Sequence, residues 1–83
     1  MAMNDDEILH EITAMSNEEH ELLHQGERHG GLDEAQHARL GELKVEIDRL
    51  WDLLRQRRAR RHAGLNPEGA QERDSDTVEN YKQ

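Results

Sequence analysis

Eighty-three residues allow one small domain, and a single core of this size is marginal without self-association. The chain contains no cysteine, so neither a disulfide nor a thiolate zinc site stabilises it. Hydrophobic residues make up 33% of the sequence and charged residues 36%, which suits a narrow apolar stripe on charged helices and not a sandwich or barrel. The net charge of −8 argues against a surface that attracts nucleic acid or anionic lipid as a whole.

Two further classes of protein are not expected. No stretch of the sequence is apolar for long enough to span a bilayer. The N-terminus lacks the basic and apolar segments of a secretory signal. We therefore expect a cytoplasmic protein that does not bind a membrane.

The first predicted helix covers about residues 4–27. Asn4 is a good N-cap, and Glu7 follows it at the spacing of a capping box. Asp5 and Asp6 add negative charge where it favours the helix dipole. Helical spacings of three, four and seven separate the apolar residues Ile8, Ile12, Met15 and Leu22. We expect fraying near Gln25–Arg28 and a break at Gly30-Gly31.

The second predicted helix covers about residues 33–63. Asp33 is its N-cap, with Gln36 completing a capping box. An apolar seam follows at helical spacing: Leu40, Leu43, Ile47, Leu50 and Leu54. Gly64 occupies the position that favours a left-handed residue, and Pro67 blocks continuation of the helix. Residues 66–83 then read as an extended polar tail, with Val78 and Tyr81 its only anchors.

The predicted fold class is all-α, an antiparallel two-helix hairpin in residues 1–65. A short glycine-containing connection favours antiparallel neighbours, and the two apolar seams coincide when the chain folds back near residue 30. This register pairs Ile8 with Leu53–Leu54, Ile12 with Leu50, Met15 with Ile47, and Leu22 with Leu40. It also lays the acidic start of the first helix beside the basic run Arg55–Arg61, which specifies the orientation.

The hairpin leaves apolar surface on the second helix without a partner. Trp51 and Leu53 flank its seam on opposite sides, which is more than one neighbouring helix covers. We therefore predict a homodimer, arranged as a four-helix bundle or a related pair of hairpins. The predicted interaction surface consists of Trp51, Leu53, Arg57, Arg58, Arg60 and Arg61.

One motif suggests a metal site. His20-Glu21-Leu22-Leu23-His24 matches H-E-x-x-H, in which two imidazoles one turn apart bind zinc and the glutamate acts as general base. A catalytic zinc needs a third protein ligand and a cleft, and His29 falls one residue early for the metzincin spacing. We expect surface histidines and no metal site, and keep metal binding by His20 and His24 as a remote alternative.

The basic run Arg55–Arg61 suggests a nucleic-acid patch. Acidic residues of the first helix should already neutralise part of it, while Arg60 and Arg61 overhang that helix and remain the best candidates for an external anion. No aromatic residues interleave the run, as binding of single strands would require. A nucleic-acid accessory role is therefore the runner-up, and nucleic acid is not the expected partner.

No other pattern points to catalysis. Gly30-Gly31 lies in a turn with no strand before it, so no phosphate loop is present, and no serine or threonine sits in a nucleophile motif. We expect no catalytic residues, no cofactor and no enzymatic activity. The preferred interpretation is a non-enzymatic helical interaction or structural module that pairs with itself or with an unidentified protein.

The sequence resembles a small actinobacterial family known only as a domain of unknown function. The most specific segment is Leu50-Trp51-Asp52-Leu53-Leu54-Arg55-Gln56-Arg57-Arg58-Ala59. Weaker likenesses extend the resemblance over nearly the whole chain: Glu18-Glu19-His20, Leu32-Asp33, Ala63-Gly64, Asn66-Pro67-Glu68 and Val78-Glu79-Asn80-Tyr81. His24 is not part of the family's pattern. The resemblance implies no activity, ligand or partner.

Overall fold

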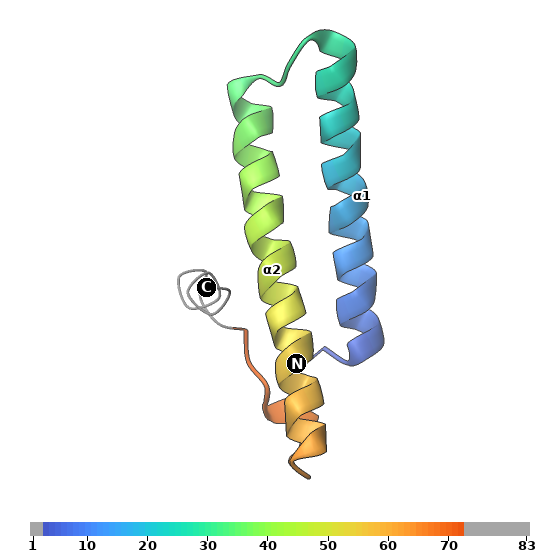
Figure 1. The fold of residues 1–83 in the computed structure, drawn as a ribbon, viewed down its shortest axis with the longest axis vertical. Helices are drawn as coiled ribbons and strands as arrows, with labels where there is room; N and C mark the ends of the chain where they lie inside the picture. Colours follow the sequence, from blue (N-terminus) through green and yellow to red (C-terminus); the bar gives the residue numbers. More distant parts are fainter. Residues whose placement is uncertain (1–2, 73–83) are drawn as a thin grey trace.

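The structure is a computed structural model, and it describes residues 3–72. Its elements are the helices α1 (Asp5–His29) and α2 (Glu34–His62) and the short 3-10 helix η1 (Pro67–Gly69). The two long helices lie side by side and antiparallel, joined by a short turn (Figure 1). The prediction of an all-α hairpin is confirmed. Among the described residues, no helix is both long and apolar enough to cross a membrane.

Helix α1 begins at a complete capping box. The side chain of Asn4 accepts a 2.8 Å hydrogen bond from the Glu7 backbone, and the Glu7 side chain accepts one of 3.3 Å from the Asn4 backbone. The helix runs to His29, beyond the segment Gln25–Arg28 where the sequence suggested fraying. It ends at Gly30, a left-handed residue at φ 74° whose N–H donates to the carbonyl of Gly26. Basic residues in the last turn interact favourably with the negative end of the helix dipole.

Helix α2 is capped in the same way and is joined closely to α1. Asp33 and Gln36 form the second capping box, with hydrogen bonds of 2.8 and 2.9 Å. Leu32, which precedes this capping box, packs closely on Gly26 of α1. A Cβ atom added to Gly26 would lie 3.0 Å from Cδ2 of Leu32. At its other end, Gly64 has a φ of 75°, which lets the chain turn away after His62.

A small apolar core holds the two helices together. Ile8, Ile12, Leu50, Leu53 and Leu54 form one buried cluster, and Met15 and Ile47 pack against it. These are the residues that the predicted register brings together. Burial of each such side chain contributes about 1.5–3 kcal/mol, so a core of this size leaves a narrow margin of stability.

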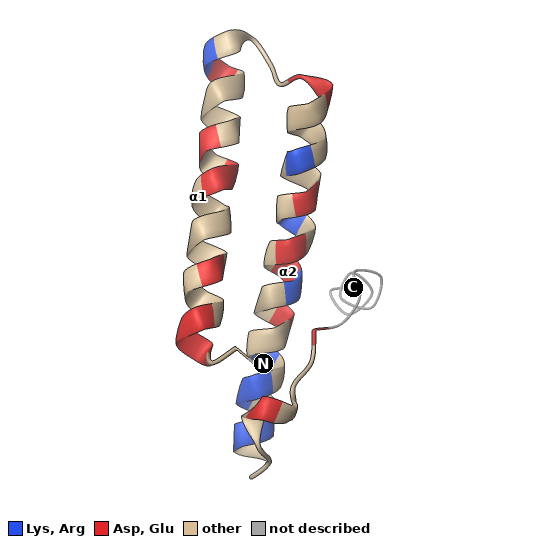
Figure 2. Ribbon diagram, turned by 180° about the vertical axis from the view of Figure 1, so that it is seen from behind, with Lys and Arg blue, Asp and Glu red and all other residues tan. Residues whose placement is uncertain are grey.

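The charges are arranged as the sequence indicated. Acidic residues occupy much of α1, including its start, and basic residues gather at the end of α2 (Figure 2). The acidic start of α1 lies beside that basic end, where Asp5 pairs with both Arg57 and Arg61. Nearer the turn, Glu18 accepts hydrogen bonds of 2.6 and 3.0 Å from Arg39.

The chain beyond α2 was only partly foreseen. Residues 66–72, here called the strap, fold back along α2 and carry the 3-10 helix Pro67–Gly69 (Figure 1). Ala70 of the strap packs against the core cluster. The expected anchors, Val78 and Tyr81, lie outside the described residues.

Candidate interaction surface

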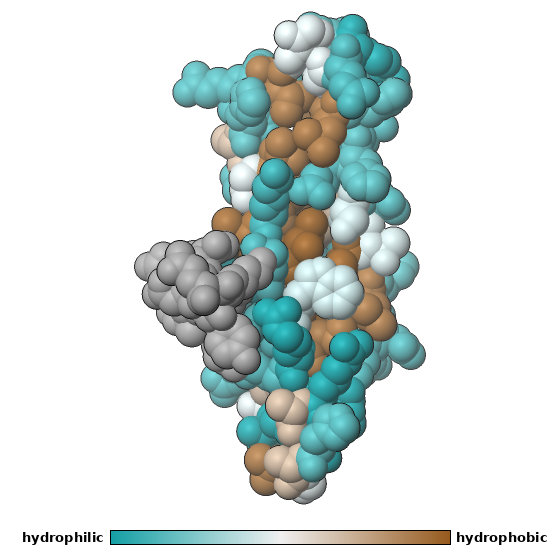
Figure 3. All heavy atoms as spheres, in the orientation of Figure 1, coloured by the Kyte–Doolittle hydropathy of each residue, from teal (hydrophilic) through white to brown (hydrophobic). Residues whose placement is uncertain are grey.

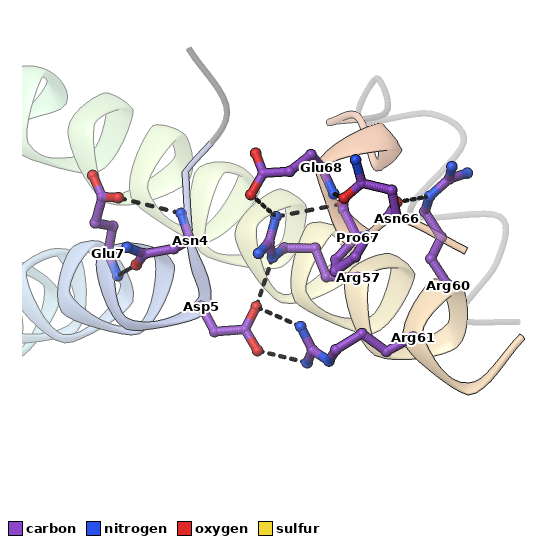
Figure 4. A network of polar contacts seen from close by, with 9 residues as sticks. All are labelled: Asn4, Asp5, Glu7, Arg57, Arg60, Arg61, Asn66, Pro67 and Glu68. Carbon is purple, nitrogen blue, oxygen red and sulfur yellow. Dashed lines mark hydrogen bonds and ion pairs between the residues drawn. The ribbon is translucent and has the colours of Figure 1, made fainter. Parts of the chain in front are cut away.

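Arg57 and Arg61 are used inside the hairpin. Nε of Arg57 and Nη2 of Arg61 each donate a 2.6 Å hydrogen bond to the carboxylate of Asp5 (Figure 4). The hydrogen bonds from Arg61 and Arg57 lower the pKa of Asp5 to about 2. The expectation that Arg61 overhangs the start of α1, and is left for an external anion, is therefore wrong. Its guanidinium instead donates hydrogen bonds to both carboxylate oxygens of Asp5, the first residue of α1.

Two arginines at the end of α2, Arg57 and Arg60, contact the strap. Nη1 of Arg57 lies 3.4 Å from the carbonyl oxygen of Pro67 and 3.7 Å from Glu68 Oε1, and the residue is only 5% exposed. Nε of Arg60 donates a 2.6 Å hydrogen bond to the carbonyl of Asn66 (Figure 4). Arg60 is therefore also bound within the chain.

The two remaining arginines of the basic run differ. Arg55 lies 3.8 Å from the carboxylate of Asp52. Arg58 is exposed and makes no hydrogen bond or ion pair with the described part of the chain. The predicted patch thus leaves Arg58 as the arginine most available to a partner.

Gln56 fixes the far part of the strap. Its side-chain nitrogen donates to the carbonyl of Gln71 at 2.5 Å, and its side-chain oxygen accepts from the Gln71 N–H at 3.3 Å. One amide side chain thus satisfies both backbone groups of one residue, as a neighbouring strand would. Nε of Arg49, seven residues before Gln56 on α2, lies 3.6 Å from Oε1 of Glu72, the residue after Gln71. Sequence reasoning missed this attachment.

The two apolar residues that were assigned to a second copy have different surroundings. Leu53 is 8% exposed and belongs to the core. It shares a helical stripe with Arg49, Arg57 and Arg60, all of which contact the strap, so the strap covers this side of α2. Trp51 is 38% exposed. Of these two residues, only Trp51 is left exposed by the hairpin and the strap.

The opposite side of the hairpin forms a continuous surface, here called the Trp51 face. Residues seven apart share one side of a helix, which groups Leu9, Ser16 and Leu23 on α1 and Lys44, Trp51 and Arg58 on α2. Ser16 and Lys44 line one open hollow between the helices. Apolar side chains follow the seam on this side of the molecule (Figure 3).

Several large apolar side chains of this face are in contact with water. Leu9 is 38% exposed and Leu23 is 43% exposed, similar to Trp51. The other side carries the Glu18–Arg39 pair and the strap. The hairpin therefore has one side covered by the strap and an ion pair, and one side on which Leu9, Leu23 and Trp51 are exposed.

The histidines of the H-E-x-x-H motif lie on the surface of α1. His20 and His24 are exposed, and His24 Nδ1 lies 3.9 Å from the Glu27 carboxylate. Within residues 3–72, no three histidine or acidic side chains are grouped so that they could hold a metal ion. The structure does not bring His29 to the pair.

Fold and surface together define a small two-helix hairpin protein that exposes Leu9, Leu23 and Trp51 along one side. The chain belongs to DUF2630, a family described as proteins of unknown function, whose sequence profile matches residues 4–83. The resemblance noted from the sequence is thereby confirmed.

The similar curated proteins are mycobacterial. The uncharacterised proteins Rv0898c of Mycobacterium tuberculosis and Mb0922c of Mycobacterium bovis are each 47% identical over 55 residues. The match covers 65% of this chain and 63% of each relative, so it spans slightly less than two thirds of their length. No solved structure matches the chain.

Proposed function

We propose that this protein is a non-enzymatic helical interaction module that pairs with a second copy through the Trp51 face. The observation that carries the proposal is the exposure of Trp51, Leu9 and Leu23 along one side of a hairpin whose other side is closed. Two such faces in contact form a four-helix bundle, the arrangement in which amphipathic hairpins bury their remaining apolar surface.

The size of the core supports self-association. Few apolar side chains of the hairpin are fully buried, and the chain has no disulfide to supplement them. Covering the Trp51 face adds aromatic and leucine burial at about 25 cal/mol per Å² of apolar area. An isologous contact of this kind is the commonest way in which small proteins form oligomers.

The titratable groups support a structural role. Asp5 and Glu18 have lowered pKa values, and Arg39 and Arg61 have raised ones, because of hydrogen bonds between the two helices. Perturbed groups of an active site gather in a cleft and face a common point. Here they lie in two separate pairs that hold the hairpin closed.

The two alternatives have less support. A nucleic-acid role needs several free cations in a row, whereas Arg57, Arg60 and Arg61 are bound within the chain. A metal role needs more ligands than His20 and His24 on one exposed helix turn. The interaction module is therefore the function that we propose.

Sedimentation equilibrium of the full chain tests the proposal. We expect a dimer for the natural sequence and a folded monomer for Trp51→Glu, because the charge would be buried without a partner in the contact. Leu65→Glu is the matched control: Leu65 is 53% exposed but follows the end of α2, away from the face, so this variant should stay dimeric. If Trp51→Glu unfolds, Leu23→Glu provides the same test. A natural chain that is monomeric and folded at all concentrations overturns the proposal.

A further inference from the structure

The Trp51 face allows two symmetric pairings with a second copy. If the two-fold axis runs across the helices, each helix lies on its own counterpart, α1 on α1 and α2 on α2. If the axis runs along the helices, α1 of each copy lies on α2 of the other. Both pairings bury Trp51, so apolar burial alone does not choose between them.

The charges of the two helices favour one of these two pairings. Helix α1 carries eight acidic residues against a single basic one, Arg28, whereas α2 carries eight basic residues against five acidic ones. Packed helices lie about 8–10 Å apart, within the Debye length of about 10 Å at 0.1 M salt. An axis across the helices places the two acidic α1 helices together. An axis along the helices places each acidic α1 on the basic α2 of the partner.

We infer that the dimer has its two-fold axis along the helices, so that the α1 helices are diagonal neighbours in a four-helix bundle. This inference rests on the proposed self-association. The charges that give the hairpin its own orientation, Asp5 against Arg57 and Arg61, then also orient the pair of hairpins. Electrostatic complementarity of this kind specifies the arrangement more than it adds affinity.

Side chains at the two ends of the face fit this arrangement. Because Ile8 and Ile12 share a cluster with Leu50 and Leu54, Leu9 and Trp51 lie at the same level of the hairpin. A two-fold axis along the helices keeps every residue at its level. Leu9 therefore meets Trp51 of the partner subunit.

Arg58 and Lys44, two cations of the face that make no ion pair within residues 3–72, also gain acidic partners in this arrangement. Arg58 lies at the level where α1 begins, as the contacts of its neighbour Arg57 with Asp5 show. In the inferred dimer it faces the acidic first turn of the partner's α1. Lys44 and Glu19 line one hollow of the hairpin and therefore lie at the same level, so this axis places Lys44 opposite Glu19 of the partner subunit. No such match exists for the two α1 helices in the other pairing.

Single-cysteine variants and a short thiol-to-thiol crosslinker distinguish the two pairings, since the natural chain has no cysteine. Leu9 and Leu23 are fourteen residues apart on α1, about 21 Å at 1.5 Å per residue. Leu9→Cys alone and Leu23→Cys alone should each crosslink to an identical chain. A mixture of Leu9→Cys and mass-tagged Leu23→Cys should give no mixed product above the non-specific level. His10→Cys, exposed and on the outer side of α1, is the matched control and should not crosslink.

The opposite pattern overturns the inference. A mixed Leu9–Leu23 product, with no crosslink of either variant to itself, establishes an axis across the helices, and the proposed self-association survives. The absence of a dimer by mass at the crosslinking concentration overturns both the inference and the proposed function. The mass of each variant is measured by sedimentation before crosslinking, so that these two failures are told apart.

Discussion

The carboxylate of Asp5, the first residue of α1, accepts a 2.6 Å hydrogen bond from Nε of Arg57, a side chain near the end of α2 that is only 5% exposed. The same guanidinium lies beside Pro67 and Glu68 of the strap. Arg57 thus joins the start of α1, the end of α2 and the strap.

This contact should make stability depend on pH in a defined window. Because the pKa of Asp5 falls from 3.8 to about 2 on folding, its pairing adds stability that is fully present above pH 3.8 and is lost as the pH falls toward 2. Denaturant unfolding between about pH 6 and pH 2 should show the natural chain and Asp5→Asn converging at the acid end. A gap between the natural chain and Asp5→Asn that is constant over this range would contradict the assignment.

Replacement of Arg57 should be costly, and replacement of its neighbour should not. Arg57→Ala removes a nearly buried cation and leaves Asp5 without its inner partner, for an expected loss of about 2–3 kcal/mol, below the range for a fully buried pair. Arg58→Ala removes an exposed side chain and should change the free energy of unfolding by about 0.5 kcal/mol or less. Equal losses in the two variants, measured by urea unfolding, would show that Arg57 does not act as described.

The strap should depend on the side chain of Gln56 and not on that of Gln71. Gln56→Ala removes both hydrogen bonds to the Gln71 backbone, with an expected cost of about 1 kcal/mol and faster hydrogen exchange at the Gln71 amide. Gln71→Ala keeps the backbone groups and should leave stability unchanged within about 0.3 kcal/mol. If the two variants exchange and unfold alike, the contact does not hold the strap.

Two glycines in and beside the helices should respond to alanine with opposite sign. Gly41 lies inside α2 with open space around its added Cβ, so Gly41→Ala should stabilise the protein by about 0.5–1 kcal/mol. Gly30 has a φ of 74°, which alanine adopts only with strain, so Gly30→Ala should cost about 1 kcal/mol. Thermal unfolding measures both. A stabilising Gly30→Ala would mean that the turn is not held in the left-handed conformation.

The hairpin was predictable because its determinants are local or periodic. Capping boxes such as Asn4 with Glu7 depend on a three-residue spacing, and the seam through Ile8 and Ile12 repeats with the helix. The position of the acidic start of α1 beside the basic end of α2 was predictable from the charges alone. These signals are all written in residue type and spacing.

The strap was not predictable in the same way. Gln56 and Arg60 bind backbone groups of Gln71 and Asn66. Because every residue has such backbone groups, no pattern of side chains predicts these contacts. The consequence was that Leu53 was assigned to a second copy although the strap lies over its side of α2. Trp51, which lies on the other side, kept the exposure that the sequence predicted.

The central claim is that a second copy covers the Trp51 face, and the fluorescence of Trp51 tests it most directly. Trp51 is the single tryptophan of the chain and is 38% exposed in the hairpin. The emission maximum should therefore shift to shorter wavelength as the protein concentration rises, with the same midpoint as the change from monomer to dimer in sedimentation. Emission that stays at the wavelength of a partly exposed indole while the protein becomes dimeric, or a chain that never becomes dimeric, would contradict the account.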